Sequence, residues 1–99
     1  MISQHAVEVD PKRHTVEFEN DRVRVVRIRY GAGEKIAAHS HEAGMLVFVT
    51  DQHIRFKLPN GSIQEMKVRA GQTRWMNAVT HEPQVISDHP TEAVYIEVK

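Results

Sequence analysis

The sequence predicts an all-β fold, either a sandwich or a barrel. Hydrophobic and polar residues alternate with a period of two along most of the chain, and no segment keeps a helical period. Glycine, proline and Asn/Asp turn signals interrupt the alternation roughly every ten residues. Many short strands at such spacing are typical of β-sandwiches and β-barrels, and we expect them to form one domain.

Each expected strand is bounded by turn residues. Residues 15–19 alternate and end at Asn20-Asp21. Residues 53–58 alternate and end at Pro59-Asn60-Gly61, a hairpin signal because Asn and Gly accept a positive φ. The expected strands cover residues 15–19, 22–30, 45–50, 53–58, 62–68, 73–77, 84–87 and 93–98.

Two of these strands have unusual patterns. Residues 22–30 alternate, but the phase of the apolar residues flips at Val25-Val26, which predicts a bulge or bend in this strand. Residues 45–50 are apolar on both faces, which predicts a central strand that is covered on both sides. A barrel this small covers only one face well, so we expect a second copy of the chain to bury the other in a homodimer.

The composition narrows the possible functions. The 99 residues include 13 Lys and Arg and 13 Asp and Glu, a balance that does not favour nucleic acid as a partner. No apolar run is long enough for a signal peptide or a membrane span, so we expect a cytoplasmic protein without a membrane partner. Cysteine is absent, which excludes disulfides and thiolate ligands, and a metal site would need nitrogen and oxygen ligands.

The chain contains seven histidines, an unusually high number, and two of them stand two residues apart. Residues i and i+2 of a strand point to the same side, so His39 and His41 can present both imidazoles to one point. His81 follows the turn at Gly71 and one further strand, where a third ligand could come from a neighbouring strand. The alternative is that His39 and His41 only belong to a polar strand face.

The other glutamates and histidines are weaker candidates for metal ligands. Glu42 and Glu82 directly follow candidate histidines and should face the opposite side of their strands. His53 shares a face with charged residues and should be solvent-facing. His5, His14 and His89 lie in termini or turns and receive no role.

The histidine spacing resembles the two motifs of the cupin family of small β-barrels. The first motif is Gly, five residues, His-x-His, then Glu after three or four residues, and Gly33, His39 and His41 fit its first half. The second is Gly, five residues, Pro-x-Gly, two residues, His, three residues and Asn, which Gly71 and His81 match loosely. The resemblance implies a double-stranded β-helix, or jelly-roll, barrel over residues 15–98, with residues 1–14 as an N-terminal arm.

Departures from these motifs change the implied ligand set. Met45 or Leu46 stands where the family has its glutamate. The other departures are Gln52 for the glycine that closes the first motif, Asn77 for the proline, Val79 for the glycine and Val85 for the asparagine of the second. What remains of the family's set is a three-histidine site, in which His39, His41 and His81 would bind a divalent ion of Fe, Zn, Ni, Mn or Cu. We expect its affinity to fall as the pH falls through about 6, because ligands must be neutral imidazoles.

Three functions remain open. Some cupin dioxygenases hold non-haem iron with three histidines, so the resemblance implies a metal-dependent dioxygenase that acts on a small organic molecule. The missing glutamate favours instead a non-catalytic protein that binds or senses a small ligand. An isomerase or cyclase is third, because the inward-facing positions offer no obvious Asp or Glu as acid or base. The catalytic residues stay open; the expected pocket-lining residues are Met45, Phe56, Trp75 and Asn77.

Overall fold

Nine β-strands and one short helix make up residues 4–99, the part of the chain that the computed structural model describes. The elements are α1 (Ala6–Val9), β1 (His14–Glu19), β2 (Val23–Tyr30), β3 (His39–His41), β4 (Gly44–Phe48), β5 (Gln52–Lys57), β6 (Ile63–Val68), β7 (Thr73–Met76), β8 (Val79–Val85) and β9 (Thr91–Val98).

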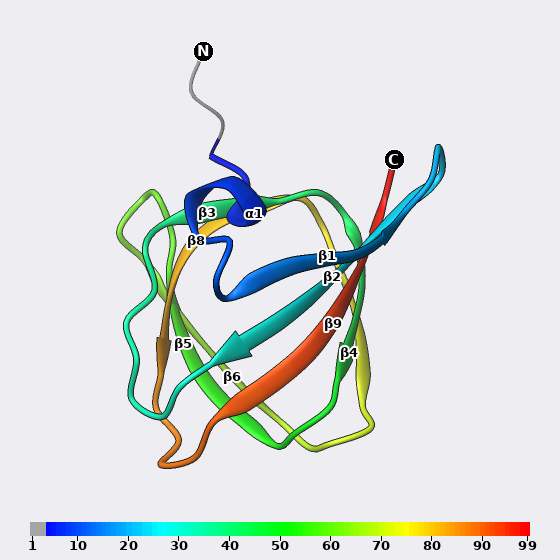
Figure 1. The fold of residues 1–99 in the computed structure, drawn as a ribbon. Coiled ribbons are helices and arrows are strands. Elements are labelled where there is room, and N and C mark those ends of the chain that lie inside the picture. Colours follow the sequence, from blue (N-terminus) through cyan, green and yellow to red (C-terminus); the bar gives the residue numbers. More distant parts are fainter. Residues whose placement is uncertain (1–3) are drawn as a thin grey trace.

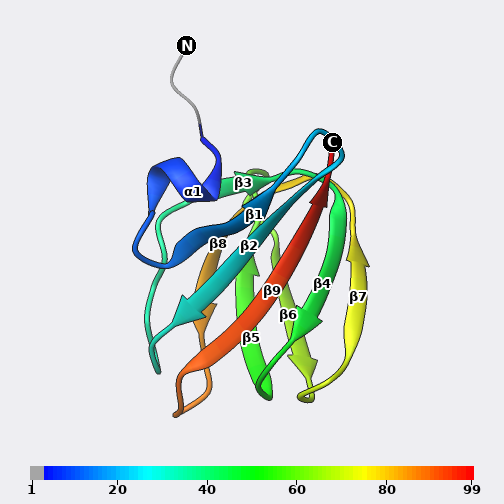
Figure 2. The ribbon, with the colours of Figure 1, turned by 45° about the vertical axis from the view of Figure 1, so that its right-hand side comes forward.

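The strands form two antiparallel sheets that face each other (Figures 1 and 2). The five-stranded sheet has the order β1-β2-β9-β4-β7, and the four-stranded sheet has the order β3-β8-β5-β6. The predicted all-β fold is confirmed, although the strands form two sheets and not a closed barrel. Apolar side chains from both sheets fill the space between them. The main cluster contains Val26, Ile28, Tyr30, Ile36, Leu46, Phe48, Ile54, Met66, Val68, Val85, Ala93 and Tyr95.

The predicted bulge exists, but it lies in the neighbouring strand. Val16 of β1 pairs with Val26, and Phe18 pairs with Val25, so Glu17 is the extra residue. β2 pairs with β9 without interruption from Val23 to Tyr30. A bulge within residues 22–30 was therefore the wrong explanation of the phase flip.

Two other properties of β2 produce the flip. Its outward positions near the start are apolar, since Val23 and Val25 point away from the core. Its inward position between them is Arg24, which forms an ion pair with the buried carboxylate of Glu97 at 3.2 Å. Apolar residues outside and a charged residue inside reverse the usual pattern for a few residues.

β4 is covered on one face within a single chain, and not on both as predicted. Leu46 and Phe48 are buried between the sheets, whereas Met45 is 37% exposed and Val49 is 43% exposed on the outside. The apolar residues on the two faces of this strand therefore have different surroundings: one face packs in the core, and the other is exposed.

The segment around His81 is more regular than predicted. β8 runs from Val79 to Val85, so His81 lies inside a strand and not in a turn before a strand at 84–87. Of the predicted N-terminal arm, residues 1–3 lie outside the described residues. α1 lies beside β1 and β3 (Figure 1), and the Ser40 N–H donates to the carbonyl of Gln4 at 2.7 Å.

Within residues 4–99, no helix is both long and apolar enough to cross a lipid bilayer.

Candidate metal centre

The pairing of β3 with β8 brings the three predicted ligands together. His39 lies directly opposite His81 in the antiparallel register, and His41 lies two residues further along β3. The ring centroids are 4.9 Å apart for His39 and His41, 5.0 Å for His39 and His81, and 5.5 Å for His41 and His81. All three side chains are buried.

A fourth histidine, His14, joins this cluster from β1. Its ring centroid lies 4.6 Å from that of His39 and 5.8 Å from that of His41. One ligand nitrogen from each of His14, His39 and His41 lies within 4.8 Å of the others. In this group, His14 occupies the position that sequence reasoning assigned to His81.

The alternation of β1 contained the signal for His14. His14 precedes Val16 by two residues and therefore shares its inward face. The predicted strand began at residue 15, which left His14 in the arm. Extending the alternating pattern by one residue would have placed this histidine between the sheets.

The hydrogen bonds of His14 and His39 leave their ring nitrogens suited to a metal. His39 Nδ1 lies 2.8 Å from the carbonyl of Ala37, and His14 Nδ1 lies 3.0 Å from the carbonyl of Asp10. A carbonyl only accepts, so each Nδ1 carries the proton and each Nε2 carries the lone pair. His39 Nε2 is left without a partner among residues 4–99, whereas His14 Nε2 lies 2.6 Å from the hydroxyl of Tyr30.

Two of the clustered nitrogens have no hydrogen-bond partner within residues 4–99. They are His39 Nε2 and His41 Nδ1, and both are buried. An unsatisfied buried polar atom costs roughly 1–3 kcal/mol, and such atoms are uncommon in native folds. A cation between these nitrogens would satisfy both, so the donor set fits a divalent metal ion.

Burial keeps the four imidazoles neutral. Burial, with a smaller contribution from His39, lowers the pKa of His14 to about 4 and that of His81 to about 3. Burial also lowers the pKa of His39, and it lowers that of His41 well below its usual value. At neutral pH the cluster therefore offers lone pairs, as metal ligands must.

A second group lies beside the first. Single ligand atoms of His5, His41 and Glu97 are also within 4.8 Å of one another. Arg24, however, reaches both of the others, with Nε 3.2 Å from a Glu97 oxygen and Nη2 2.5 Å from His5 Nε2. Its guanidinium already neutralises Glu97, so a metal cation is less favourable here than among His14, His39 and His41.

Glu97 is a buried carboxylate that sequence reasoning missed. It is 1% exposed and faces inward with Tyr95 and Ala93, two and four residues earlier in β9. Burial alone would raise its pKa, but hydrogen bonds from His5 and from the Glu42 N–H lower it overall. The expectation that no acidic residue faces inward was therefore wrong, and the period of two in β9 would have revealed Glu97.

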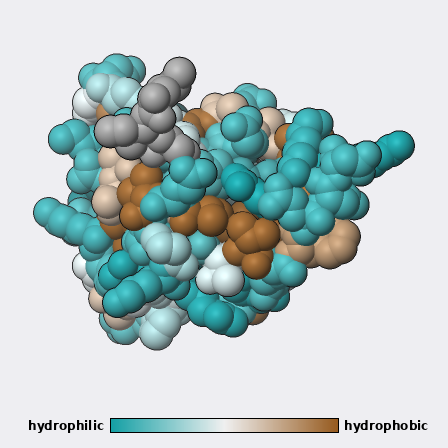
Figure 3. Space-filling model, turned by 45° about the horizontal axis from the view of Figure 1, so that its top comes forward, coloured by the Kyte–Doolittle hydropathy of each residue, from teal (hydrophilic) through white to brown (hydrophobic). Residues whose placement is uncertain are grey.

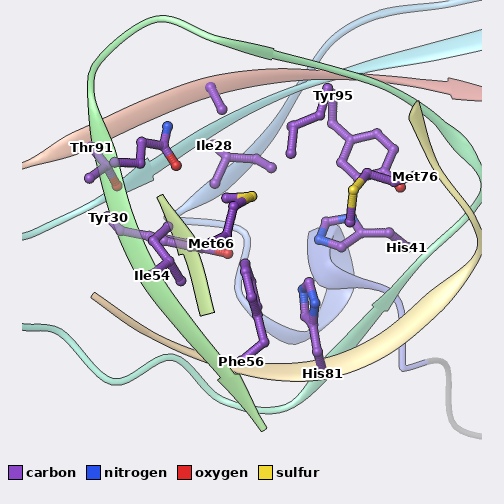
Figure 4. Close-up of a pocket in the computed structure, with 13 residues that line it drawn as sticks. Ile28, Tyr30, His41, Ile54, Phe56, Met66, Met76, His81, Thr91 and Tyr95 are labelled. Atoms are coloured by element: carbon purple, nitrogen blue, oxygen red, sulfur yellow. The ribbon is translucent and has the colours of Figure 1, made fainter. Parts of the chain in front are cut away.

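A small apolar cavity adjoins the cluster (Figure 4). His41 and His81 form part of its wall, with Tyr95 stacked on His41 at 4.7 Å and Phe56 stacked on His81 at 4.5 Å. Among the described residues, the lining consists of Ile28, Tyr30, His41, Leu46, Gln52, Ile54, Phe56, Met66, Met76, His81, Thr91, Ala93 and Tyr95. The cavity is narrow, with a volume of about 30 Å³.

A surface pocket reaches the cluster from outside. It is lined by Ser40, His41, Glu42, Ala78, Val79 and Thr80. His41 thus contributes to both the inner cavity and this pocket, while its Nδ1 remains buried. Glu42 and Glu82 are exposed, in keeping with their expected outward orientation.

The expected pocket-lining residues divide into two groups. Phe56 lies on the cavity wall, whereas Met45 and Trp75 are 37% and 52% exposed on the outer face. Asn77 is exposed and accepts a hydrogen bond from the indole of Trp75 at 3.3 Å. The neighbours of the two outward residues, Leu46 and Met76, line the cavity in their place.

Comparisons with known proteins identify the fold. A cupin domain from Bordetella pertussis is 25% identical, with a TM-score of 0.78 over 100% of this chain and 98% of the other. An RmlC-like cupin family protein with a double-stranded β-helix fold from Methanocaldococcus jannaschii is 16% identical, with a TM-score of 0.63 over 90% and 83%. A cupin superfamily protein from Desulfitobacterium hafniense is 9% identical, with a TM-score of 0.60 over 86% and 74%. No family model and no curated protein matches the chain.

Proposed function

The chain is a small protein of the cupin superfamily, and we propose that it binds one divalent metal ion through its buried histidine cluster. His39 and His41 are the central ligands, and His14 and His81 complete the coordination from either side. The observation that carries this proposal is the pair of buried, unpartnered nitrogens on His39 and His41. Neutral imidazoles and matched second hydrogen bonds to backbone carbonyls support it.

The neutral ligands define the chemistry that an ion would supply. A divalent ion held only by imidazoles keeps a net charge near +2, so it would act as a strong Lewis acid or, with iron or copper, support redox chemistry. The protein's own contribution is an apolar wall that excludes bulk water from the side of His41 and His81. Phe56 and Tyr95 fix the planes of these two rings by stacking.

The finer proposal is a dioxygenase reaction on a small organic molecule. Within residues 4–99 the cavity lining contains no Asp, Glu or Lys, so an activity that depends on a carboxylate or amine as acid or base has little support here. The same lining also suits a non-catalytic protein that binds or senses a small ligand, which is the second candidate. An isomerase or cyclase ranks third, because Glu97 lies outside this cavity lining and is held by Arg24.

Titration of untagged, EDTA-treated protein with single metal ions tests the metal site. We expect one Zn²⁺, Fe²⁺ or Ni²⁺ per chain, and His39→Ala or His41→Ala should weaken binding by more than about 100-fold. Comparing the metal affinities of His14→Ala and His81→Ala shows which of these two histidines binds the ion. His89→Ala, an exposed control, should leave the affinity unchanged. Binding that survives both central substitutions would refute the site.

Oxygen consumption by the iron-loaded protein distinguishes the two main functions. A panel of small diketones and catechols is the appropriate substrate set for the proposed reaction. Turnover that is lost in His41→Ala supports the dioxygenase. Stoichiometric metal without oxygen uptake on any compound supports the binding protein.

A further inference from the structure

A row of apolar side chains crosses the outer face of the whole five-stranded sheet. Directly paired residues on neighbouring strands share a face, and the pairs connect Phe18 to Val25, Val25 to Ile96, Ile96 to Met45, and Met45 to Trp75. We call these five residues the outer row. With strands about 4.8 Å apart, it spans about 19 Å.

The outer row is exposed at its ends and continues into neighbouring apolar positions. Phe18 is 55% exposed and Trp75 is 52% exposed. Val98, which pairs with Val23, adds a further position that is 47% exposed. In Figure 3, brown apolar side chains gather in a band across the face of the molecule shown, between teal hydrophilic ones.

The bulge in β1 places the first member of this row. In a regular strand, Phe18 would share the inward face of Val16. The extra residue Glu17 shifts the register, so Phe18 pairs with outward-facing Val25. A bulge that turns a phenylalanine from the core to solvent exposes its ring to water, which costs free energy in the isolated chain. Burial of the ring against another surface would offset this cost.

The charges beside the outer row neutralise one another. Arg27 pairs with Glu17 at 3.0 Å and with Glu92 at 2.9 Å, and Arg29 pairs with Glu92 at 3.0 Å. Two arginines and two glutamates therefore form a rim without net charge, and the chain as a whole has none. An identical surface meets no net repulsion here, whereas a strongly charged partner would find no complementary field.

We propose that the outer row is the contact surface of a homodimer, in which two five-stranded sheets face each other across a two-fold axis. With the axis parallel to the strands and near Ile96, the middle of the row, Phe18 of one copy lies over Trp75 of the other, and each aromatic end gains an aromatic neighbour. The interface is isologous, so each copy contributes the same outer row to the contact.

The size of the face is sufficient for such a contact. Five strands about 4.8 Å apart, with on average about three outward residues each at a spacing of about 6.7 Å, give a flat footprint of about 500 Å². The projecting side chains of Phe18, Met45 and Trp75 raise the accessible area above this value. Specific interfaces begin at roughly 600 Å² per partner, so the face reaches the lower end of their range.

Sedimentation velocity over a range of protein concentrations tests the proposal. The wild-type chain should sediment at twice its monomer mass of 11.4 kDa. Phe18→Glu and Met45→Glu should each return it to the monomer, because each would bury a charge against an apolar side chain of the other copy. Ile63→Glu is the matched control: Ile63 is 54% exposed, as Phe18 is, but lies on β6 of the other sheet.

Fluorescence of Trp75, the single tryptophan, adds a readout from within the proposed contact itself. Its emission should shift to the blue as the concentration rises through the dissociation constant, and the shift should vanish in Phe18→Glu. A wild-type monomer at high concentration overturns the proposal, and the face then serves another partner. A dimer without the Trp75 shift, or one broken equally by Ile63→Glu, also overturns it.

Discussion

His14 is the proposed ligand whose lone pair is already in use. Its Nδ1–H donates to the carbonyl of Asp10, so its Nε2 accepts the hydroxyl hydrogen of Tyr30 at 2.6 Å. Burial raises the pKa of Tyr30, so this hydroxyl stays protonated and remains a donor. Coordination by His14 must break this bond, and Tyr30 therefore competes with the metal for the same nitrogen.

Tyr30→Phe should strengthen metal binding. A buried hydrogen bond contributes about 0.5–1.5 kcal/mol net, so its removal from the metal-free state should raise the affinity by roughly twofold to tenfold. Competition with a chromogenic chelator measures this change. Tyr95→Phe is the control, because the Tyr95 hydroxyl donates to the carbonyl of Glu42 and not to a histidine nitrogen. An unchanged or lower affinity in Tyr30→Phe would mean that His14 Nε2 does not bind the ion.

At the scale of strands, Gly44 sets how closely β4 approaches β9. A Cβ atom at this position would lie 2.1 Å from the carbonyl oxygen of Ile96 and 2.9 Å from the Cα of Glu97. Both contacts are with backbone, which cannot move aside without opening the sheet. β4 also carries Leu46, whose side chain forms part of the cavity wall.

Gly44→Ala should lower the free energy of unfolding by about 1–3 kcal/mol or more, through this overlap. Urea denaturation measures the loss. Gly61→Ala provides the comparison, because no atom of residues 4–99 lies within 4 Å of its added Cβ and the positive φ of 84° is what opposes the substitution. That substitution should cost about 1 kcal/mol. Equal losses in the two variants would show that the β4–β9 contact is not the constraint.

Periodicity and turn chemistry predicted most of the strands, because both are local. The alternation of residues 53–58 and the turn at Pro59-Asn60-Gly61 give β5, the hairpin and β6 directly. The pairing of β9 with both β2 and β4 joins residues far apart in sequence, and no local pattern predicts it. The flip at Val25-Val26 was misread for this reason: a bulge in β1 and a buried partner in β9 lie outside the strand that carries the pattern.

The candidate site was predicted only in part for a similar reason. His39 and His41 share one strand face, so their spacing alone identified them, and the pairing of β3 with β8 adds His81. His14 and Glu97 lie near opposite ends of the chain, where the resemblance to the family motifs offers no position for them. Their inward orientation follows from the alternation of β1 and β9, but their proximity to His39 and His41 follows only from the folded sheets.

At the scale of the whole molecule, buried neutral imidazoles make the stability of the metal-free fold depend on pH. An unfolded histidine titrates near 6.5, whereas burial lowers the pKa of His14 to about 4 and that of His81 to about 3. At pH values below 6.5 and above these lowered pKa values, the unfolded chain binds more protons than the folded chain. The free energy of unfolding therefore falls as the pH falls. His14 alone accounts for a loss of about 3 kcal/mol between pH 6.5 and 4.

Urea midpoints of the EDTA-treated protein from pH 7.5 to 4.5 should therefore fall steadily once the pH passes below about 6.5. Total stabilities of single domains are about 5–15 kcal/mol, so a loss of this size is readily measured. His14→Phe should flatten the slope because it removes one of the protonations, whereas exposed His89→Ala should not. Glu97, whose pKa is lowered, loses its contribution only below about pH 4.5 and does not obscure this window. A flat profile between pH 6.5 and 4.5 would contradict neutral burial of the cluster.

The same lowered pKa values imply that protons compete with the metal at a lower pH than the value near 6 expected from free imidazoles. Metal titrations at pH 6 and 5 measure that displacement.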